Sequence, residues 1–296
     1  MNFKVDDWVR HPTYGDGQVS EDRGDKYLIQ FVTQGERLML KQAIESAGQP
    51  PYSGFSFGKR KPSGTPQFKV VRVKREPAPD FTHLVKRFLD VFEGGFEAES
   101  FDRRERQYKE RAAGRLRGSL GRQQLDDLLY NEQFGEVCDR ALHVVKETNL
   151  IFKQEIMKLI TAFKNEQFRR AFATDLRELL YGAAELETRF NSFAAVLAHG
   201  EVAIWTIATY FQFLLSDGEL MFMKPTVTKK MSESLNIALN YRSEPNWLTY
   251  SKLQELAMRT DSELRARGLK PHSGIDLQGF IWASIKIEEG KYGKEE

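Results

Sequence analysis

The stretch "VRHPTYGDGQV", residues 9–19, decides the fold at the start of this chain of 296 residues. Gly15 and Gly17 bracket an aspartate, a spacing typical of a tight turn in which glycine adopts a positive φ. The segments "QVS", "KYLIQFV" and "ERLMLK" follow, separated by "DRGD" and "TQGE". This alternation predicts four or five short strands within residues 1–45, and so few residues bury a core only by curling into a small β-barrel.

The chain from residue 80 onward is predicted to be almost entirely helical. Asp80 and Asn246 stand at predicted helix starts, and Gly268 at a predicted helix end. The most apolar run, residues 203–215, is too short for a membrane span, which needs about 20 apolar residues. We therefore predict a buried core helix there and no membrane partner. The fold class is predicted to be α+β, a small barrel followed by a helical domain.

Basic residues are concentrated in two short segments, although the net charge is only +2. Residues 52–75 contain seven basic residues and no acidic one, and residues 103–122 contain eight basic and two acidic residues. The first segment lies in a stretch rich in Gly, Pro and Ser, which predicts a linker over residues 46–79 with one possible strand at residues 68–76. The predicted domains are therefore residues 1–45, the linker, and residues 80–296.

Cysteine usage and the N-terminal residues indicate a cytoplasmic protein. Cys138 is the single cysteine, so an internal disulfide is excluded. Its helical setting predicts a buried, inert thiol. The first ten residues include no apolar run of the kind found in secretory signals.

The first 40 residues resemble the tudor-like (SH3-like) barrel at the C-terminus of UvrD/PcrA-type helicases and the related barrel of CarD-type transcription regulators. The resemblance rests on residues 5–19 and on "GERLML". It implies a barrel that binds proteins, RNA polymerase or a DNA-processing complex among them. The predicted partner-binding residues are Trp8, His11 and Tyr14; a role in shaping a turn and capping the core is the alternative for His11 and Tyr14.

The helical part resembles an uncharacterised bacterial helical family associated with DNA restriction and defence proteins. The segments "TNLIFKQEIMKL", "LRELLYG", "MFMKPTVTKK", "YRSEPNW" and "GIDLQGFIWASI" carry this resemblance. It implies an association with DNA processing and assigns no catalytic residue.

The sequence lacks the common catalytic motifs. No phosphate-binding glycine loop, dinucleotide fingerprint, zinc-ligand spacing or nucleophile turn is present. We therefore predict no cofactor and no metal, and leave open whether the protein is an enzyme.

A basic helix over residues 103–122 is the stronger signal for a partner. At 100° per residue several arginines fall on or beside one face, and only Glu105 and Glu110 are available within this segment to neutralise them. Such a stripe binds phosphates without regard to sequence. The predicted nucleic-acid contacts are Lys59, Arg60, Lys61, Arg72, Lys74, Arg75, Arg103, Arg104, Arg111, Arg115 and Arg122; a solvated linker and a solvated helix face are the alternatives.

A second constellation of polar residues is embedded in apolar sequence near the end of the chain. Helical DNA glycosylases hold a flipped base against aromatic rings, with an aspartate and sometimes a lysine as chemical groups. Asp276 and Lys224 are candidates for those roles. The predicted pocket residues are Thr226, Arg242, Asn246, Trp247 and Trp282. Helix caps and core rings are the structural alternative, with Asp276 capping the last helix.

These observations together favour a DNA-binding protein of genome defence, repair or transcription. The basic segments would bind DNA and the barrel would bind a protein partner. A base-excising DNA glycosylase is the alternative, and a subunit of a larger complex without nucleic-acid contact is a third possibility.

Overall fold

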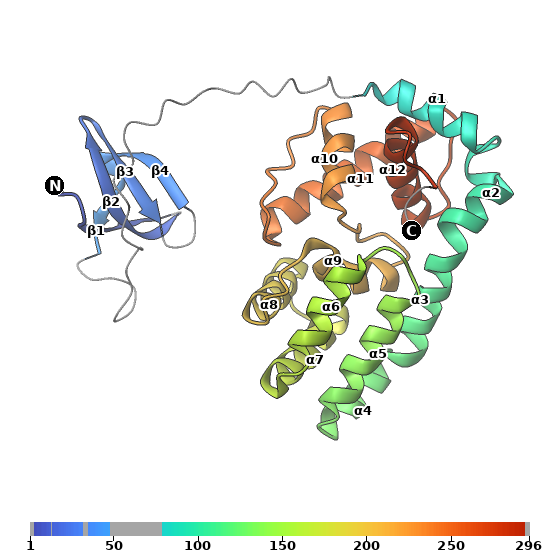
Figure 1. Ribbon diagram of the computed structural model, residues 1–296, viewed down its shortest axis with the longest axis horizontal. Helices are drawn as coiled ribbons and strands as arrows, with labels where there is room; N and C mark the ends of the chain where they lie inside the picture. The colour runs from blue at the N-terminus through green and yellow to red at the C-terminus, as the bar shows by residue number, and fades with distance from the viewer. Residues whose placement is uncertain (1–2, 13, 32–34, 48–78, 294–296) are drawn as a thin grey trace. The chain divides into compact units, whose positions relative to one another are not determined.

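The chain divides into two compact units, formed by residues 1–72 and residues 73–296, and each is considered by itself. The computed structural model describes residues 3–12, 14–31, 35–47 and 79–293. The first unit contains an antiparallel sheet and the second is helical (Figure 1), which confirms the α+β class. The predicted strand at residues 68–76 lies outside the described residues.

Five strands form one antiparallel sheet with the spatial order β4-β3-β2-β1-β5. Strand β1 pairs with both β2 and β5, so the short strand β5 adds to the side of β1 that β2 leaves open. The register shifts between Val19 and Glu21, where a bulge interrupts the pairing of β2 with β3. The strands are β1 (Trp8–His11), β2 (Gly15–Arg23), β3 (Lys26–Phe31), β4 (Gly35–Leu40) and β5 (Glu45–Ser46).

The opening stretch reverses direction between His11 and Gly15, earlier than predicted: Gly15, Asp16 and Gly17 begin strand β2 and pair with His11, Arg10 and Val9 of β1. Gly15 has a φ of +72°, the left-handed conformation that favours glycine, where β2 begins. At Gly17 a Cβ atom would lie 2.7 Å from the side chain of Ile29 and 2.8 Å from that of Phe31. Only glycine lets strand β2 lie this close to the buried side chains of β3. The core of this unit is formed by Val9, Val19, Tyr27, Ile29, Phe31 and Ile44.

The second unit is a bundle of helices around one apolar core. No helix in the described ranges is both long and apolar enough to cross a membrane. The π-helical segment η3 (Asp102–Arg106) joins two helices, and a short turn η2 (Gly95–Glu97) precedes it. The α-helices are α1 (Phe81–Val91), α2 (Glu99–Phe101), α3 (Gln107–Ser119), α4 (Arg122–Tyr130), α5 (Phe134–Lys146), α6 (Lys153–Ala162), α7 (Glu166–Tyr181), α8 (Leu186–His199), α9 (Trp205–Leu215), α10 (Pro225–Ser234), α11 (Trp247–Ala266) and α12 (Gly274–Glu288).

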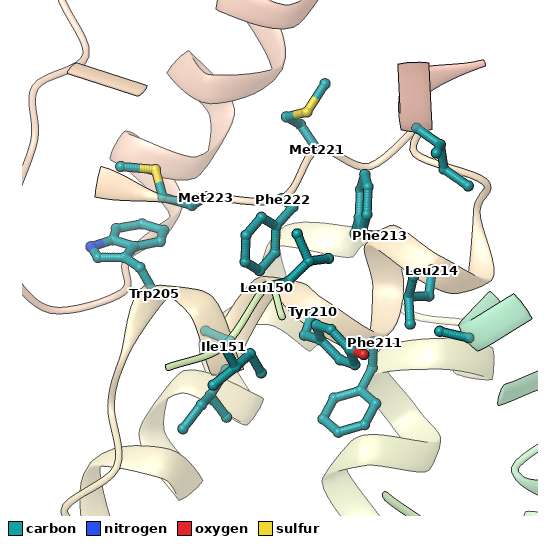
Figure 2. Packing of buried hydrophobic residues seen from close by; sticks show 14 of the residues in the cluster. Leu150, Ile151, Trp205, Tyr210, Phe211, Phe213, Leu214, Met221, Phe222 and Met223 are labelled. Atoms are coloured by element: carbon teal, nitrogen blue, oxygen red, sulfur yellow. The ribbon is translucent and has the colours of Figure 1, made fainter. Parts of the chain in front are cut away.

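Helix α9 lies in the interior of the bundle. All its residues from Trp205 to Leu214 are buried, which confirms the predicted core helix. Figure 2 shows how α9 packs: Leu150 lies between Tyr210 and Phe222, so the segment before α6 is held against it. The predicted start of α11 is also confirmed, because the Asn246 side chain accepts a hydrogen bond from the backbone N–H of Thr249.

Helix α12 packs against the first helices of the unit, although they are far apart in the sequence (Figure 1). The Phe280 ring lies 5.0 Å from the ring of Phe88 and 5.9 Å from that of Phe81, between centroids. Gly279 permits this approach, because a Cβ atom there would lie 2.9 Å from the Phe101 ring and 3.1 Å from the Cβ of Glu105. A glycine therefore sets how closely α12 approaches η3.

We predict that Gly279→Ala lowers the free energy of unfolding by about 1–3 kcal/mol, because the added methyl group overpacks this contact. Gly135→Ala is the control: a Cβ atom there meets nothing within 4 Å. It should leave stability unchanged or slightly higher, since alanine is the better helix former. Urea unfolding of both variants measures the difference, and equal stabilities would contradict the proposed role of Gly279.

Candidate functional site

One buried ion pair joins the beginning and the end of the helical unit. The Arg106 guanidinium donates hydrogen bonds of 2.7 and 2.9 Å to the two carboxylate oxygens of Asp276. It also donates to the carboxylate of Asp102 and to the carbonyl oxygen of Phe96. The Asp276 side chain is completely buried and that of Arg106 is 13% exposed. Because a two-pronged pair fixes orientation as well as distance, it holds α12 against η3.

The π-helical geometry of η3 directs two consecutive side chains inward. A π-turn has more residues per turn than an α-helix, and such segments often occur at functional sites. Here Arg106 reaches Asp276, while the buried Glu105 carboxylate accepts hydrogen bonds from Lys109 at 3.2 Å and from the Tyr292 hydroxyl at 2.7 Å. The segment thus contacts both α12 and the residues that follow it.

A cavity of about 1010 Å³ lies beside this junction. We call it the basic cavity. Its walls come from η3 and the start of α3, the end of α5, the start of α6, the residue preceding α10, α12 and the segment after α12. The lining residues are Arg104, Glu105, Tyr108, Lys146, Thr148, Asn149, Leu150, Ile151, Phe152, Lys153, Gln154, Ile156, Lys224, Trp282, Lys286, Lys291, Tyr292 and Gly293.

Positive charge dominates this lining. Six of its side chains are cationic and one is acidic: Arg104, Lys146, Lys153, Lys224, Lys286 and Lys291, against Glu105. The six cations come from six different places, so no single helix pattern accounts for the cluster; these are η3, α5, α6, the residue before α10, α12 and the segment after α12. Like charges gathered in one cavity repel each other, and an anionic ligand would relieve that repulsion.

Two of the cations lie over aromatic rings. The Lys224 ammonium is 4.0 Å from the centroid of Trp282 and 4.4 Å from that of Phe152. The Lys286 ammonium is 4.8 Å from the centroid of Trp282. Ring faces stabilise a cation without neutralising its charge. The two ammonium groups are thus held against ring faces at the cavity.

A single carboxylate beside the cavity balances several lysines. Glu289 forms ion pairs with Lys230 at 2.5 Å, Lys286 at 3.6 Å and Lys291 at 3.4 Å. Burial works to raise the pKa of the Glu289 carboxyl, but the three lysines hold it below its usual value. Glu289 thus links Lys230 of α10 to Lys286 of α12 and to Lys291 in the segment after α12.

The Glu105 side chain belongs to a buried polar cluster in the wall of the cavity. Lys109 is completely buried, and burial lowers the pKa of its ammonium while the charge of Glu105 opposes that change. Burial and the Glu105 charge raise the pKa of the Tyr292 phenol, which therefore stays protonated and donates to Glu105. The Glu105 carboxylate thus has two hydrogen-bond partners, Lys109 and Tyr292. The hydrogen bond from Tyr292 fixes the segment after α12.

The wall between α5 and α6 is anchored to the core helix α9. The Tyr210 hydroxyl donates to the carbonyl oxygen of Val144 at 2.8 Å and lies 2.9 Å from the Thr148 hydroxyl. The Thr206 hydroxyl donates to the carboxylate of Glu155, which also accepts from the backbone N–H of Phe152. The cavity wall therefore has fixed supports, although its residues form a connecting segment.

The structure corrects the predicted basic helix in two ways. The helix is not continuous over residues 103–122: α3 ends at Ser119, and Arg122 begins α4. Several basic side chains are paired with acids from outside the segment, and only the pair of Arg103 with Glu99 has the i,i+4 spacing that a sequence reveals. The pairs are Arg103 with Glu99, Arg106 with Asp276, Arg115 with Glu147 and Arg117 with Asp217.

The remaining predicted phosphate contacts lie in different places. Arg104 lines the basic cavity, and Arg111 and Arg115 line a separate hollow along α3. Arg122 lies over the ring of Tyr181, 5.5 Å from its centroid. The linker residues Lys59, Arg60, Lys61, Arg72, Lys74 and Arg75 lie outside the described residues.

The predicted pocket is only partly assembled. Lys224 and Trp282 line the basic cavity, but Thr226, Arg242, Asn246 and Trp247 are not in its lining. Asp276 is not in the lining either, because both of its oxygens are held by Arg106 in the interior. Its predicted pairing with Lys224 in one pocket is therefore not observed. Asp276 is not the cap of α12, since the Ser273 hydroxyl accepts from the backbone there.

In the sheet unit, the predicted partner-binding residues are partly buried. The His11 and Tyr14 rings lie 4.7 Å apart, and the Tyr14 ring packs 5.5 Å from Phe31. Trp8 pairs in register with Gln18 on β2. The two rings therefore form the edge of the small core, which agrees with the alternative role of His11 and Tyr14 in shaping a turn and capping the core.

Sequence reasoning missed most of the cavity. Lys146, Lys153, Lys286 and Lys291 are separate in the sequence, and no spacing rule links them. Phe152, whose side chain is half-exposed at the cavity, was not among the predicted site residues. A usable signal was present at "TNLIFK", where a turn-like start to a helix places an aromatic ring beside a lysine.

The arrangement suits the binding of an anion that carries a flat ring. No group of three or more potential metal ligands occurs within the described ranges. Burial raises the pKa of the Cys138 thiol to about 12, so a thiolate nucleophile is not supported. The chemistry that the cavity offers is charge-assisted hydrogen bonding to phosphate or carboxylate oxygens, with aromatic faces beside them.

Comparison of the chain with models of protein families, with curated proteins and with solved structures finds no match in any of the three.

We predict that Asp276→Asn lowers the free energy of unfolding by about 3 kcal/mol, because it removes the completely buried one of the two carboxylates that pair with Arg106. Asp126→Asn is the control, since its partner Arg177 lies nearer the surface. The control substitution should lower the free energy of unfolding by about 1 kcal/mol or less. Urea unfolding at neutral pH compares the two, and similar losses would contradict the structural role of Asp276.

Proposed function

We propose that the helical unit binds single-stranded nucleic acid, with DNA as the first candidate, and that the basic cavity holds one or two of its nucleotides. The observation that carries this proposal is the composition of the cavity: six cationic side chains, one acidic side chain and the rings of Tyr108, Phe152, Trp282 and Tyr292. Proteins that bind single strands combine a positively charged groove with aromatic side chains on which bases stack.

The size of the cavity favours an unpaired strand over a duplex. Its volume of about 1010 Å³ lies at the upper end of ordinary ligand pockets, which are roughly 300–1,000 Å³. A base enters such a space only when it is unstacked and unpaired. Phe152 is half-exposed and presents a ring for stacking at the cavity.

The sheet unit contributes a protein-binding module in this proposal. We propose that its strands close into a tudor-like barrel, as the sequence resemblance implies. The Leu38 and Leu40 side chains of strand β4 are each more than two-fifths exposed. An exposed apolar pair suits a protein partner better than phosphate. The protein would then act in the cytoplasm, in genome defence, repair or transcription.

The base-excising alternative gains no support from the residues assigned to it. A catalytic carboxylate must reach the reacting atoms, and Asp276 is buried against Arg106 away from the cavity lining. The proposal therefore stops at binding.

We predict that Lys146→Gln combined with Lys153→Gln weakens binding of a ten-nucleotide oligothymidylate by at least about tenfold in dilute salt. Each charge-assisted hydrogen bond is worth about 1.5–3 kcal/mol, and 1.4 kcal/mol is a factor of ten. The slope of log K against log salt should fall by about 1.4, because each single-strand phosphate contact contributes about 0.7. Fluorescence anisotropy at several salt concentrations measures both quantities.

The matched control is Lys158→Gln combined with Lys164→Gln, which removes two exposed charges from the same helix region outside the cavity. This control should retain nearly full affinity. A duplex of the same length and free thymidine monophosphate are tested in parallel, and both should bind more weakly than the single strand. Equal losses in the two double variants, or stronger binding of the duplex, would refute the proposed site.

A further inference from the structure

A second hollow lies farther along the helix that helps to form the basic cavity. Its volume is about 500 Å³, and its lining residues are Arg111, Arg115, Gly118, Ser119 and Glu147. We call it the second hollow. Lys146 lines the basic cavity and the adjacent Glu147 lines the second hollow, so the end of α5 lies between the two.

One face of η3 and α3 leads from the basic cavity to the second hollow. Arg104 and Tyr108 line the first, and Arg111 and Arg115 line the second. These residues are spaced by four, three and four positions, which places their side chains along one side of a helix. At 1.5 Å per residue, Arg104 and Arg115 lie roughly 16 Å apart along the axis.

Glycine occurs on the exposed side of α3 where alanine would make a better helix. Gly114 and Gly118 are both exposed, and a Cβ atom added to either would meet nothing within 4 Å. Glycine inside a helix costs stability relative to alanine. At Gly118, which lines the second hollow, the missing side chain lets a ligand backbone come close to the helix.

We infer that the second hollow is an adjoining subsite for the same nucleic-acid strand, where Arg111 and Arg115 take a phosphate several nucleotides away from the basic cavity. This inference rests on the proposed function. At the 3.4 Å rise per nucleotide of a duplex strand, the distance of about 16 Å between Arg104 and Arg115 corresponds to roughly five nucleotides. A stretched single strand spans the same distance with fewer nucleotides. A strand long enough to reach both places gains affinity because the second contact is intramolecular.

Glu147 competes with the ligand in this subsite. Its carboxylate lies 2.5 Å from the Arg115 guanidinium, on the side that faces the second hollow. A phosphate that binds Arg115 must displace this carboxylate or share the guanidinium with it. Removing the charge of Glu147 therefore strengthens binding of a strand that reaches Arg115.

The test compares a two-nucleotide oligothymidylate, which the basic cavity holds by itself, with the ten-nucleotide strand, using the full chain. Gly118→Ala should weaken binding of the long strand at least fivefold and leave the affinity for the short strand unchanged. It should also raise the melting temperature of the protein. Gly114→Ala is the control, because it adds the same methyl group outside the lining of either cavity. It should raise the melting temperature of the protein and leave its affinity for both strands unchanged.

Two further variants test the same subsite from opposite directions. Arg111→Gln should lower the affinity for the long strand only. Glu147→Gln should raise the affinity for the long strand only. If Gly118→Ala and Gly114→Ala bind the long strand equally, or if all variants affect both strands alike, the subsite is refuted while the basic cavity stands. If neither strand binds the wild-type chain, the proposed function and this inference both fail.

Discussion

The ion pair between Arg106 and Asp276 is the interaction on which the site depends, because it joins segments that are 170 residues apart. Without it, nothing in the chain order would bring Trp282 and Tyr292 beside Arg104 and Tyr108. The π-turn of η3 points Arg106 at α12, and Gly279 removes the side chain that would keep α12 away. The basic cavity is therefore a product of tertiary packing and belongs to no single helix.

The charge distribution explains why such a cavity is more than a packing defect. Gathering like charges lowers stability, and a protein without use for them would place acidic or apolar residues among them. Here the lysines are held in place by other groups: Lys224 lies over two rings, and Glu289 is shared among three ammonium groups. Such support orients the positive charges and leaves part of their field available to a ligand.

Local features of the fold could be predicted from the sequence, because their causes are local. The alternating strands, the buried run around Tyr210 and the cap at Asn246 each depend on neighbouring residues, whereas the turn predicted at Gly15 and Gly17 lies in strand β2. The arginine stripe could not be judged in the same way. Its acidic partners Glu147 and Asp217 lie just after two other helices, α5 and α9, and residues 120–121 separate α3 from α4. Most cations of the cavity are brought together only by folding, so only Arg104, Lys224 and Trp282 of its lining were anticipated.

The central claim, that the basic cavity holds an unpaired nucleotide, is tested most directly by photocrosslinking. A ten-nucleotide oligothymidylate with 4-thiothymidine at single positions would be irradiated with the full chain, and crosslinked peptides identified by mass spectrometry. The account predicts crosslinks in residues 146–156 and 282–293, competed by unlabelled single strand and weakened by salt. Crosslinks confined to α7, α8 or the sheet unit, with none in those two segments, would contradict it.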